Sequence, residues 1–220
     1  EYMVVPAYEV VPLGNVDPKI GVALADAGLT SYAAAEQCAK YVKDDGYSVI
    51  IGVGGLGSYS LQYLKNITKG KVIVVDTTEE KLERATKLGA DYVFMSNAET
   101  ADKIMELTGG RGVDGVIDFV GIDPTFELAK AITRSTGTIV IIGISQDSMK
   151  VAFGLIKGGV DVRVSIGGTI DQLKSAVELA KAGKLVMDVQ HYKFSELPQA
   201  LQDLRDNKLT GRGVITFDDI

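Results

Sequence analysis

The sequence predicts an α/β domain built on a doubly wound, parallel sheet of six strands. Apolar, β-branched runs alternate with segments of helical periodicity along most of the 220 residues. The strongest runs, "KVIVVD", "VDGVIDFV" and "GTIVIIG", are apolar almost throughout, which is typical of strands buried on both faces. The segments between the runs are long enough for crossover helices, and such connections join parallel strands.

The predicted elements alternate along the chain. Strands are expected at residues 47–52, 71–76, 92–95, 112–120, 137–143 and 160–166. Helices are expected at residues 55–67, 79–88, 100–108, 124–132 and 149–157. Glycines mark the turns between them, at Gly70, Gly89, Gly109, Gly110 and Gly137.

The two flanks of this pattern differ from its centre. Residues 1–20 contain short strand-like pieces broken by three prolines, and a helix in "LTSYAAAEQCAKYV" then leads into the sheet. After the sixth strand we expect a helix at 170–182, a strand in "VMDVQHYKF" and a final strand in "RGVITF". Between those two strands, Ser195 is expected to cap a helix that ends near Asn207. The terminal strands are therefore expected to belong to a second unit.

Composition restricts the partners and the location. The formal net charge of −6 argues against a nucleic-acid surface, which usually carries a basic excess. There is no uncharged apolar run of about 18 residues that would cross a membrane, and the first residues do not resemble a secretory leader. The single cysteine, Cys38, excludes an internal disulfide; we expect a buried, inert thiol, with a reactive nucleophile as the alternative. These features favour a cytoplasmic protein.

A glycine-rich motif follows the first predicted strand. The segment from Gly52 to Gly57, "GVGGLG", fits G-x-G-x-x-G between a strand and a helix, which is the context of a dinucleotide-binding turn. Gly52 would permit the tight turn, Gly54 would let the backbone approach a pyrophosphate, and Gly57 would let the helix pack closely. The helix N-terminus would offer free N–H groups to the phosphates. A purely structural strand–helix turn is the alternative.

An acidic residue ends the second predicted strand. Asp76 stands 19 positions after Gly57, where a carboxylate accepts hydrogen bonds from the adenosine ribose and repels a 2′-phosphate. No arginine adjoins it, so NAD is favoured over NADP. Lys81, one turn into the next helix, is either a ribose contact or a solvated lysine beside Glu79 and Glu80.

These segments together resemble the zinc-dependent medium-chain alcohol dehydrogenase family. "ADAGLTSYAA", "GVGGLGSYSLQYLK", "VVDTTEEKLERATKLGADYV", "GVDGVIDFVG", "GTIVIIG" and "GRGVITF" occur in the family's order, and the similarity runs over almost the whole chain. The resemblance implies a Rossmann NAD-binding domain joined to a GroES-like, zinc-carrying catalytic domain that is incomplete here. It also implies hydride transfer between NAD and a small-molecule alcohol or carbonyl compound.

The resemblance implies roles for individual residues. Asp26 stands where the family places a ligand to its catalytic zinc, Thr30 and Leu56 stand beside the nicotinamide, and Arg212 would reach the pyrophosphate. Ser165, Ile166 and Gly167 would touch the carboxamide. The ends of the fourth and fifth strands should also face the ligand, because ligands lie beyond the carboxyl ends of parallel strands. These are Val120, Gly121, Ile142, Gly143 and Ile144. Gly55, within the glycine motif, is also a predicted cofactor-binding residue.

The family's other zinc ligands are a cysteine in a Cys-Gly pair and the histidine and glutamate of a Gly-His-Glu motif. Neither motif occurs in this sequence. Its one histidine, His191, lies in a predicted strand where we expect a structural role. The chain starts at Glu1, and we expect it to be a fragment that lacks dehydrogenase activity alone, because Asp26 by itself cannot hold zinc. The expected division is a catalytic-domain remnant at 1–25, the NAD-binding domain at 26–168, and segments at 169–220 that return to the catalytic domain.

Two other functions stay open at this stage. One is a zinc-independent reductase of the quinone type, which would usually prefer NADPH; the other is a non-catalytic dinucleotide-binding module. Fold similarity alone does not separate them. The sixth strand is expected at the sheet edge, and the resemblance implies a homodimer or homotetramer in which Val162 and Val164 lie at the interface.

Overall fold

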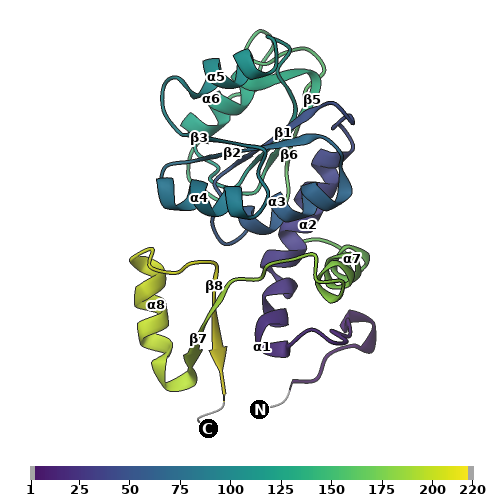
Figure 1. Ribbon diagram of the computed structural model, residues 1–220, viewed down its shortest axis with the longest axis vertical. Helices are drawn as coiled ribbons and strands as arrows, with labels where there is room; N and C mark the ends of the chain where they lie inside the picture. Colours follow the sequence, from purple (N-terminus) through teal and green to yellow (C-terminus); the bar gives the residue numbers. More distant parts are fainter. Residues whose placement is uncertain (1–2, 218–220) are drawn as a thin grey trace.

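The computed structural model describes residues 3–217, and Figure 1 shows two lobes. The upper lobe holds a six-stranded parallel sheet of order β3-β2-β1-β4-β5-β6. This is the predicted doubly wound arrangement, in which the chain reverses direction of winding between β1 and β4. The strands are β1 (Tyr47–Ile51), β2 (Lys71–Asp76), β3 (Tyr92–Met95), β4 (Val113–Asp118), β5 (Thr133–Ile141) and β6 (Asp161–Val164).

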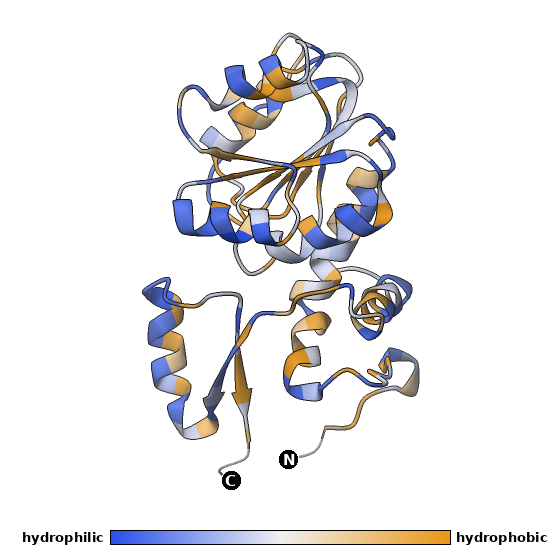
Figure 2. Ribbon diagram, in the orientation of Figure 1, coloured by the Kyte–Doolittle hydropathy of each residue, from blue (hydrophilic) through white to orange (hydrophobic). Residues whose placement is uncertain are grey.

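Helices cover both faces of this sheet. In Figure 1, α5 (Thr100–Leu107) and α6 (Asp123–Ile132) lie on one face, and α2 (Ala27–Ala39), α3 (Gly57–Ile67) and α4 (Glu79–Lys87) lie on the other. Successive residues of β1 serve the two faces in turn: Ile50 packs in the cluster with α2, α3 and α4, whereas Val49 and Ile51 pack with α5 and α6. Figure 2 accordingly shows the central strands as hydrophobic. The continuous apolar runs in the sequence therefore follow from burial on both faces.

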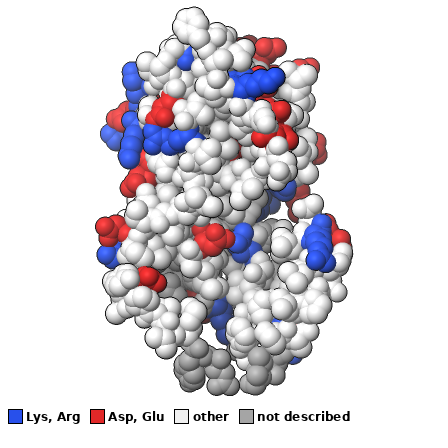
Figure 3. Space-filling view, turned by 180° about the vertical axis from the view of Figure 1, so that it is seen from behind, with Lys and Arg blue, Asp and Glu red and all other residues white. Residues whose placement is uncertain are grey.

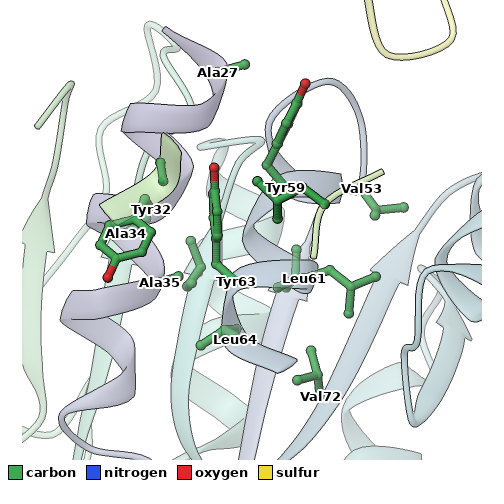
Figure 4. Packing of buried hydrophobic residues seen from close by; sticks show 14 of the residues in the cluster. Ala27, Tyr32, Ala34, Ala35, Val53, Tyr59, Leu61, Tyr63, Leu64 and Val72 are labelled. Carbon is green, nitrogen blue, oxygen red and sulfur yellow. The ribbon is translucent and has the colours of Figure 1, made fainter. Parts of the chain in front are cut away.

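The helices of the upper lobe agree closely with the predicted ranges. Most boundaries differ by one or two residues. The helices are α2 (Ala27–Ala39), α3 (Gly57–Ile67), α4 (Glu79–Lys87), α5 (Thr100–Leu107) and α6 (Asp123–Ile132). Figure 4 shows how α2 and α3 pack: the Tyr63 ring on α3 meets the edge of Tyr32 on α2, with ring centroids 5.1 Å apart.

The helix predicted at residues 149–157 is wrong. The segment forms no helix, and its one pairing is an isolated bridge between Phe153 and Ile156. Gly154 has φ +87°, which is a left-handed conformation that interrupts a right-handed helix. The apolar residues Val151, Phe153 and Leu155 alternate at every second position, which is not a helical spacing.

The predicted strand-like pieces in residues 1–20 are also wrong over the part that the structure describes; residues 1 and 2 lie outside the described range. The segment instead holds a short 3-10 turn, η1 (Ala7–Glu9), and the helix α1 (Pro18–Gly21), followed by η2 (Val22–Ala25). Pro18 occupies the first turn of α1, and the Asp17 carboxylate accepts the Lys19 N–H at 2.9 Å. A proline preceded by an aspartate thus starts a helix here.

The lower lobe contains α7 (Ile170–Lys181), β7 (Val189–Lys193), η3 (Phe194–Glu196), α8 (Leu197–Arg205) and β8 (Arg212–Thr216). β7 and β8 form a separate two-stranded parallel sheet. The prediction that Ser195 caps the last helix is wrong, because Ser195 lies inside η3 and Glu196 precedes α8. The Glu196 carboxylate instead accepts the Lys193 N–H at 2.8 Å.

The surface and the helix lengths add two further observations. On the face seen in Figure 3, Lys and Arg side chains are interspersed with Asp and Glu side chains. Between residues 3 and 217, no helix has the length and apolar character needed to cross a bilayer.

Candidate functional site

A cavity of about 1020 Å³ opens beyond the carboxyl ends of the parallel strands. It lies where the winding reverses between β1 and β4, which is the usual ligand position in such sheets. Its volume is at the upper end of the range typical for small-molecule sites. Residues predicted from the sequence that line it are Gly52, Gly54, Gly55, Leu56, Gly57, Asp76, Lys81, Val120, Ile142, Gly143 and Ile144.

The three glycines of the motif have three different environments. Gly52 adopts φ +85°, the left-handed region that the turn out of β1 requires. A Cβ atom added to Gly57 would lie 2.0 Å from the Gly52 carbonyl oxygen, so the start of α3 packs directly on the turn. A Cβ added to Gly54 would meet nothing within 4 Å, so the backbone there faces open space that a ligand can approach.

Asp76 joins the second strand to the glycine loop. Its side chain is buried, and Oδ2 accepts the Val53 N–H at 2.8 Å while Oδ1 accepts the Thr77 N–H at 2.7 Å. The Lys81 ammonium lies 3.6 Å from Oδ1. A carboxylate has about four acceptor positions, so Asp76 can fix the loop and still accept hydrogen bonds from a ligand hydroxyl.

The ends of β4 and β5 approach each other so closely that side chains are excluded. Gly121 has φ +71°, and a Cβ there would lie 2.3 Å from the Gly143 carbonyl oxygen. Asp118, which sequence reasoning missed, fixes this turn: Oδ1 accepts the Val120 and Gly121 N–H groups at 2.9 and 3.0 Å. An acidic residue inside a buried apolar run was the available signal, because a buried carboxylate must be hydrogen-bonded.

The residues predicted for the nicotinamide end lie outside the lining of this cavity, apart from Leu56. Thr30 is buried on α2, and the neighbouring Ser31 hydroxyl donates to the Leu56 carbonyl at 2.8 Å, which holds α2 against the glycine loop. At the end of β6, the Ser165 hydroxyl accepts a hydrogen bond from the Gln37 amide at 3.0 Å. Ile166 is 82% exposed, and Gly167 adopts φ +59°.

Arg212 lies over the glycine loop but is engaged by Asp26. A Cβ added to Gly55 would be 3.1 Å from Cδ of Arg212, which shows how closely the arginine covers the loop. Its guanidinium donates to the Asp26 carboxylate at 2.5 Å. The structure therefore pairs the residue predicted to reach the pyrophosphate with the residue predicted to bind zinc.

The described part of the chain does not provide a metal centre. Residues 3–217 contain no group of three His, Cys, Asp or Glu side chains placed to hold one ion. Asp26, the predicted zinc ligand, has a cation as its partner instead. The residues present do not fit a zinc ion by themselves.

Two residues considered from the sequence lie away from the cavity. Cys38 is fully buried, and burial, together with the charge of Asp114, raises the pKa of its thiol to about 12. Such a thiol stays protonated and is a poor nucleophile. His191 lies exposed on β7.

Several lining residues were not anticipated. Thr77, Ser96 and Asn97 line the cavity directly after β2 and β3. They follow the same rule that pointed to the ends of the fourth and fifth strands, so position alone would have found them. A further part of the wall comes from α6 and the residue before it: Ile122, Pro124, Thr125, Glu127, Leu128 and Ala131.

Known proteins share both the fold and the motif region. The family model described as "Zinc-binding dehydrogenase" matches residues 55–182, which is more than half of the chain. The alcohol dehydrogenase from the hyperthermophilic archaeon Aeropyrum pernix is 33% identical, with a TM-score of 0.85, over 93% of this chain and 60% of that one.

Two further solved structures are each 27% identical to this chain. The D-arabinose dehydrogenase from Sulfolobus solfataricus has a TM-score of 0.77, over 83% of this chain and 57% of that one. The acetophenone reductase from Geotrichum candidum, solved in complex with NAD, has a TM-score of 0.80, over 94% of this chain and 58% of that one. The chain thus spans less than two thirds of the length of these structures. It belongs to the zinc-binding dehydrogenase family of oxidoreductases and carries that family's Rossmann domain.

Proposed function

We propose that the chain binds NAD across the carboxyl ends of β1 and β4, and that it is the cofactor-binding part of an alcohol dehydrogenase. The observation that carries the proposal is the hydrogen bond from the Val53 N–H to the Asp76 carboxylate. It fixes the acidic side chain that would hold the adenosine ribose to the loop that would hold the pyrophosphate. The two recognition elements are therefore built as one unit.

The start of α3 supports the phosphate-binding role. Leu56 occupies the N-cap position, and it has no side-chain acceptor for the first N–H groups of the helix. These N–H groups and the positive end of the helix dipole favour an anion. Gly54 beside them leaves open space above the backbone. The Ser58 and Tyr59 N–H groups already donate to the Gly54 and Leu56 carbonyls, at 3.2 and 2.9 Å. A pyrophosphate would therefore accept chiefly from the Gly57 N–H, and Arg212 would add a charged donor.

Asp76 would select NAD over NADP. Its carboxylate lies within the cavity, where a 2′-phosphate would meet a like charge. The one cation beside it within the described residues, Lys81, lies 3.6 Å from Oδ1, so its charge is already matched by Asp76. Selection for NAD separates this proposal from a quinone-type reductase that uses NADPH.

When bound, NAD supplies the site that accepts or donates the hydride. Thr30, Leu56 and the end of β6 at Ser165 would orient the nicotinamide ring and its carboxamide. The substrate would be an alcohol or the corresponding carbonyl compound, and zinc would belong to the complete protein. We propose that the 220-residue chain alone lacks this activity, because its described residues provide no metal centre.

We also propose that two copies pair along the edge strand β6. Val164 is 81% exposed there, whereas Val162 packs against the core cluster under α5 and α6. Unpaired backbone groups on an edge strand favour pairing with a second strand. A cytoplasmic location fits a chain whose single cysteine, Cys38, is buried and free.

A titration of the purified chain with NADH and NADPH, followed by cofactor fluorescence, tests the proposal. Saturable binding of NADH with at least tenfold weaker binding of NADPH is the expected result. Equal or tighter binding of NADPH would favour the zinc-independent reductase. Absence of binding by either cofactor would overturn the proposed site. An alcohol-dependent increase in NADH with the chain alone would overturn the proposed lack of activity.

A further inference from the structure

Asp188 connects helix α4 of the upper lobe to the β7–β8 sheet of the lower lobe. Two guanidinium N–H groups of Arg84, on α4, donate to Oδ2 of Asp188 at 2.6 and 2.9 Å. Both side chains are partly buried, with 20% of Arg84 and 38% of Asp188 exposed. An ion pair with two hydrogen bonds fixes orientation as well as distance. The start of β7 is thereby tied to the helix that follows Asp76.

The backbone of Asp188 in turn holds the start of β8. Its carbonyl oxygen accepts the Arg212 N–H at 3.1 Å. Gly211 has φ +83°, and a Cβ there would lie 2.1 Å from the same carbonyl oxygen. Asp188 and the turn before Arg212 therefore pack in direct contact, and a displacement of one displaces the other.

A second tie holds the same segment to helix α3. The Gln62 amide donates to the Val186 carbonyl at 3.1 Å and accepts the Val186 N–H at 2.6 Å. Gln62 is 5% exposed, so its amide is shielded from water, whereas Val186 lies at the surface and is 55% exposed. The segment from Val186 to Asp188 is thus attached to α3 and α4, the helices after the glycine loop and after Asp76.

The charges of this junction act on a buried phenol. Tyr59 on α3 is 2% exposed, and its hydroxyl has no hydrogen-bond partner among the described residues. Burial raises its pKa to about 12, with smaller influences from the charges of Arg212, Asp188 and Arg84. The charges of all three residues thus influence one side chain of the helix that begins at the glycine loop.

We propose that Arg84 is a positioning residue for cofactor binding: through Asp188 it places Arg212 over the glycine loop, where the pyrophosphate of a dinucleotide would lie. The inference rests on the proposed function, since it needs NAD in the cavity. Arg84 itself does not line that cavity. It lies on the far side of Asp188 and acts on the ligand through the backbone of the β7–β8 sheet.

The test is a double-mutant cycle on NADH affinity in the 220-residue chain. We expect Arg84→Gln and Asp188→Asn each to weaken NADH binding about five- to tenfold, as partial loss of a charge-assisted hydrogen bond implies. Arg212→Gln should weaken binding at least as much. In the Arg212→Gln background, Arg84→Gln should have little further effect, because the contact that it positions is already gone.

Controls separate positioning from charge and from folding. Lys87→Gln removes a nearby exposed charge of the same helix and should leave NADH affinity within about twofold of the original chain, the range expected for an exposed charge. Arg84→Lys, which keeps the charge but loses the guanidinium geometry, should fall between the original chain and Arg84→Gln. Thermal unfolding of each variant identifies loss of the fold, and Asp188→Asn gives a second reading if Arg84→Gln does not fold.

The outcomes are distinct. Unchanged NADH affinity in folded Arg84→Gln and Asp188→Asn would overturn the inference while leaving the proposed cofactor site intact. Additive effects of Arg84→Gln and Arg212→Gln would also overturn it, because additivity means independent action. Failure of the unaltered chain to bind NADH would overturn the proposed function, and the inference with it.

Discussion

The guanidinium of Arg212 lies 2.5 Å from the carboxylate of Asp26, although the two residues are 186 positions apart. Asp26 precedes α2 and Arg212 begins β8, so the pair links the entry to the Rossmann domain with the second sheet. In this pairing the arginine is not free to meet an anion with its full charge. Cofactor binding and this ion pair therefore compete for the same guanidinium.

Asp26→Asn should strengthen NADH binding. The variant removes the competing carboxylate, and an exposed pair of this kind contributes at most about 1 kcal/mol, so the expected gain is about two- to fivefold. Fluorescence titration at low and high salt measures it, and the gain should shrink as salt screens the pair. Asp171→Asn, at a surface pair with Lys174, is the matched control. Weaker binding by Asp26→Asn would show that Asp26 holds Arg212 in place for the ligand.

Gly57→Ala and Gly54→Ala should separate folding from binding. The Cβ of Gly57→Ala would clash with the Gly52 carbonyl oxygen, so we expect a loss of about 1–3 kcal/mol in the free energy of unfolding. Gly54→Ala places its Cβ in open space, so it should keep its stability and lose NADH affinity. Urea unfolding and NADH titration of both variants provide the comparison. Normal NADH affinity in Gly54→Ala would contradict the assignment of that space to the cofactor.

Asp76→Asn should weaken the discrimination between NADH and NADPH. The amide keeps one oxygen for the Val53 N–H but carries no charge to repel a 2′-phosphate. The ratio of the two dissociation constants should change by about tenfold, equivalent to about 1.4 kcal/mol. Asp91→Asn, which alters an acidic residue before β3 at the amino end of the sheet, should leave the ratio unchanged. An unaltered ratio in Asp76→Asn would remove Asp76 as the selector.

Alkaline pH should destabilise the chain through Cys38. The pKa of its thiol is raised from 9.0 to about 12 in the folded state, first by burial and then by Asp114. In the unfolded chain the thiol ionises at a lower pH than in the folded chain, so rising pH favours unfolding. The stabilisation from the neutral, buried thiol is complete below pH 9 and is lost as the pH rises toward 12. In that window the free energy of unfolding should fall by about 1.4 kcal/mol per pH unit. Urea unfolding at several pH values should show a shallower slope for Cys38→Ala; equal slopes would contradict this origin.

Val164→Asp should prevent pairing along β6. The exposed side chain would place a charge at the proposed interface, where like charges from two copies would meet. Sedimentation of the unaltered chain should show a dimer or tetramer, and the variant should sediment as a monomer. Val151→Asp, in the irregular segment before β6, serves as a control for an added surface charge. If the unaltered chain stays monomeric at all concentrations, the proposed assembly is contradicted.

Local chemistry explains why the sheet could be predicted from the sequence. The ranges of β2 and β3 agree with the prediction at both ends, because each is an apolar run bounded by turn residues. The prediction of a helix at 149–157 is wrong because apolar content alone does not make a helix: Val151, Phe153 and Leu155 stand at every second position, and Gly154 adopts a left-handed conformation. Ser195 is not the cap because the 3-10 turn η3 precedes α8 and leaves Glu196 in the N-cap position.

One part of the candidate site could likewise be predicted from the sequence, and another part could not. The glycine motif and Asp76 are close in sequence and lie on adjacent strands, so their meeting at one edge followed from strand order. The pairing of Asp26 with Arg212, and the attachment of Asp188 to Arg84, depend on how the lower lobe docks on α3 and α4. Hydrophobic periodicity does not record that docking, because its contacts, polar and apolar, join segments more than 100 residues apart.

The Gln62 side chain hydrogen-bonds Val186 as a neighbouring strand would, with one donor and one acceptor. A side-chain amide on a helix thereby replaces a peptide group. Such a bond can break and re-form without disturbing the backbone ladder of either sheet. If the β7–β8 sheet swings away from α3, the same movement lifts Arg212 from the loop. Opening of the lobes and release of a dinucleotide would then follow one shared motion.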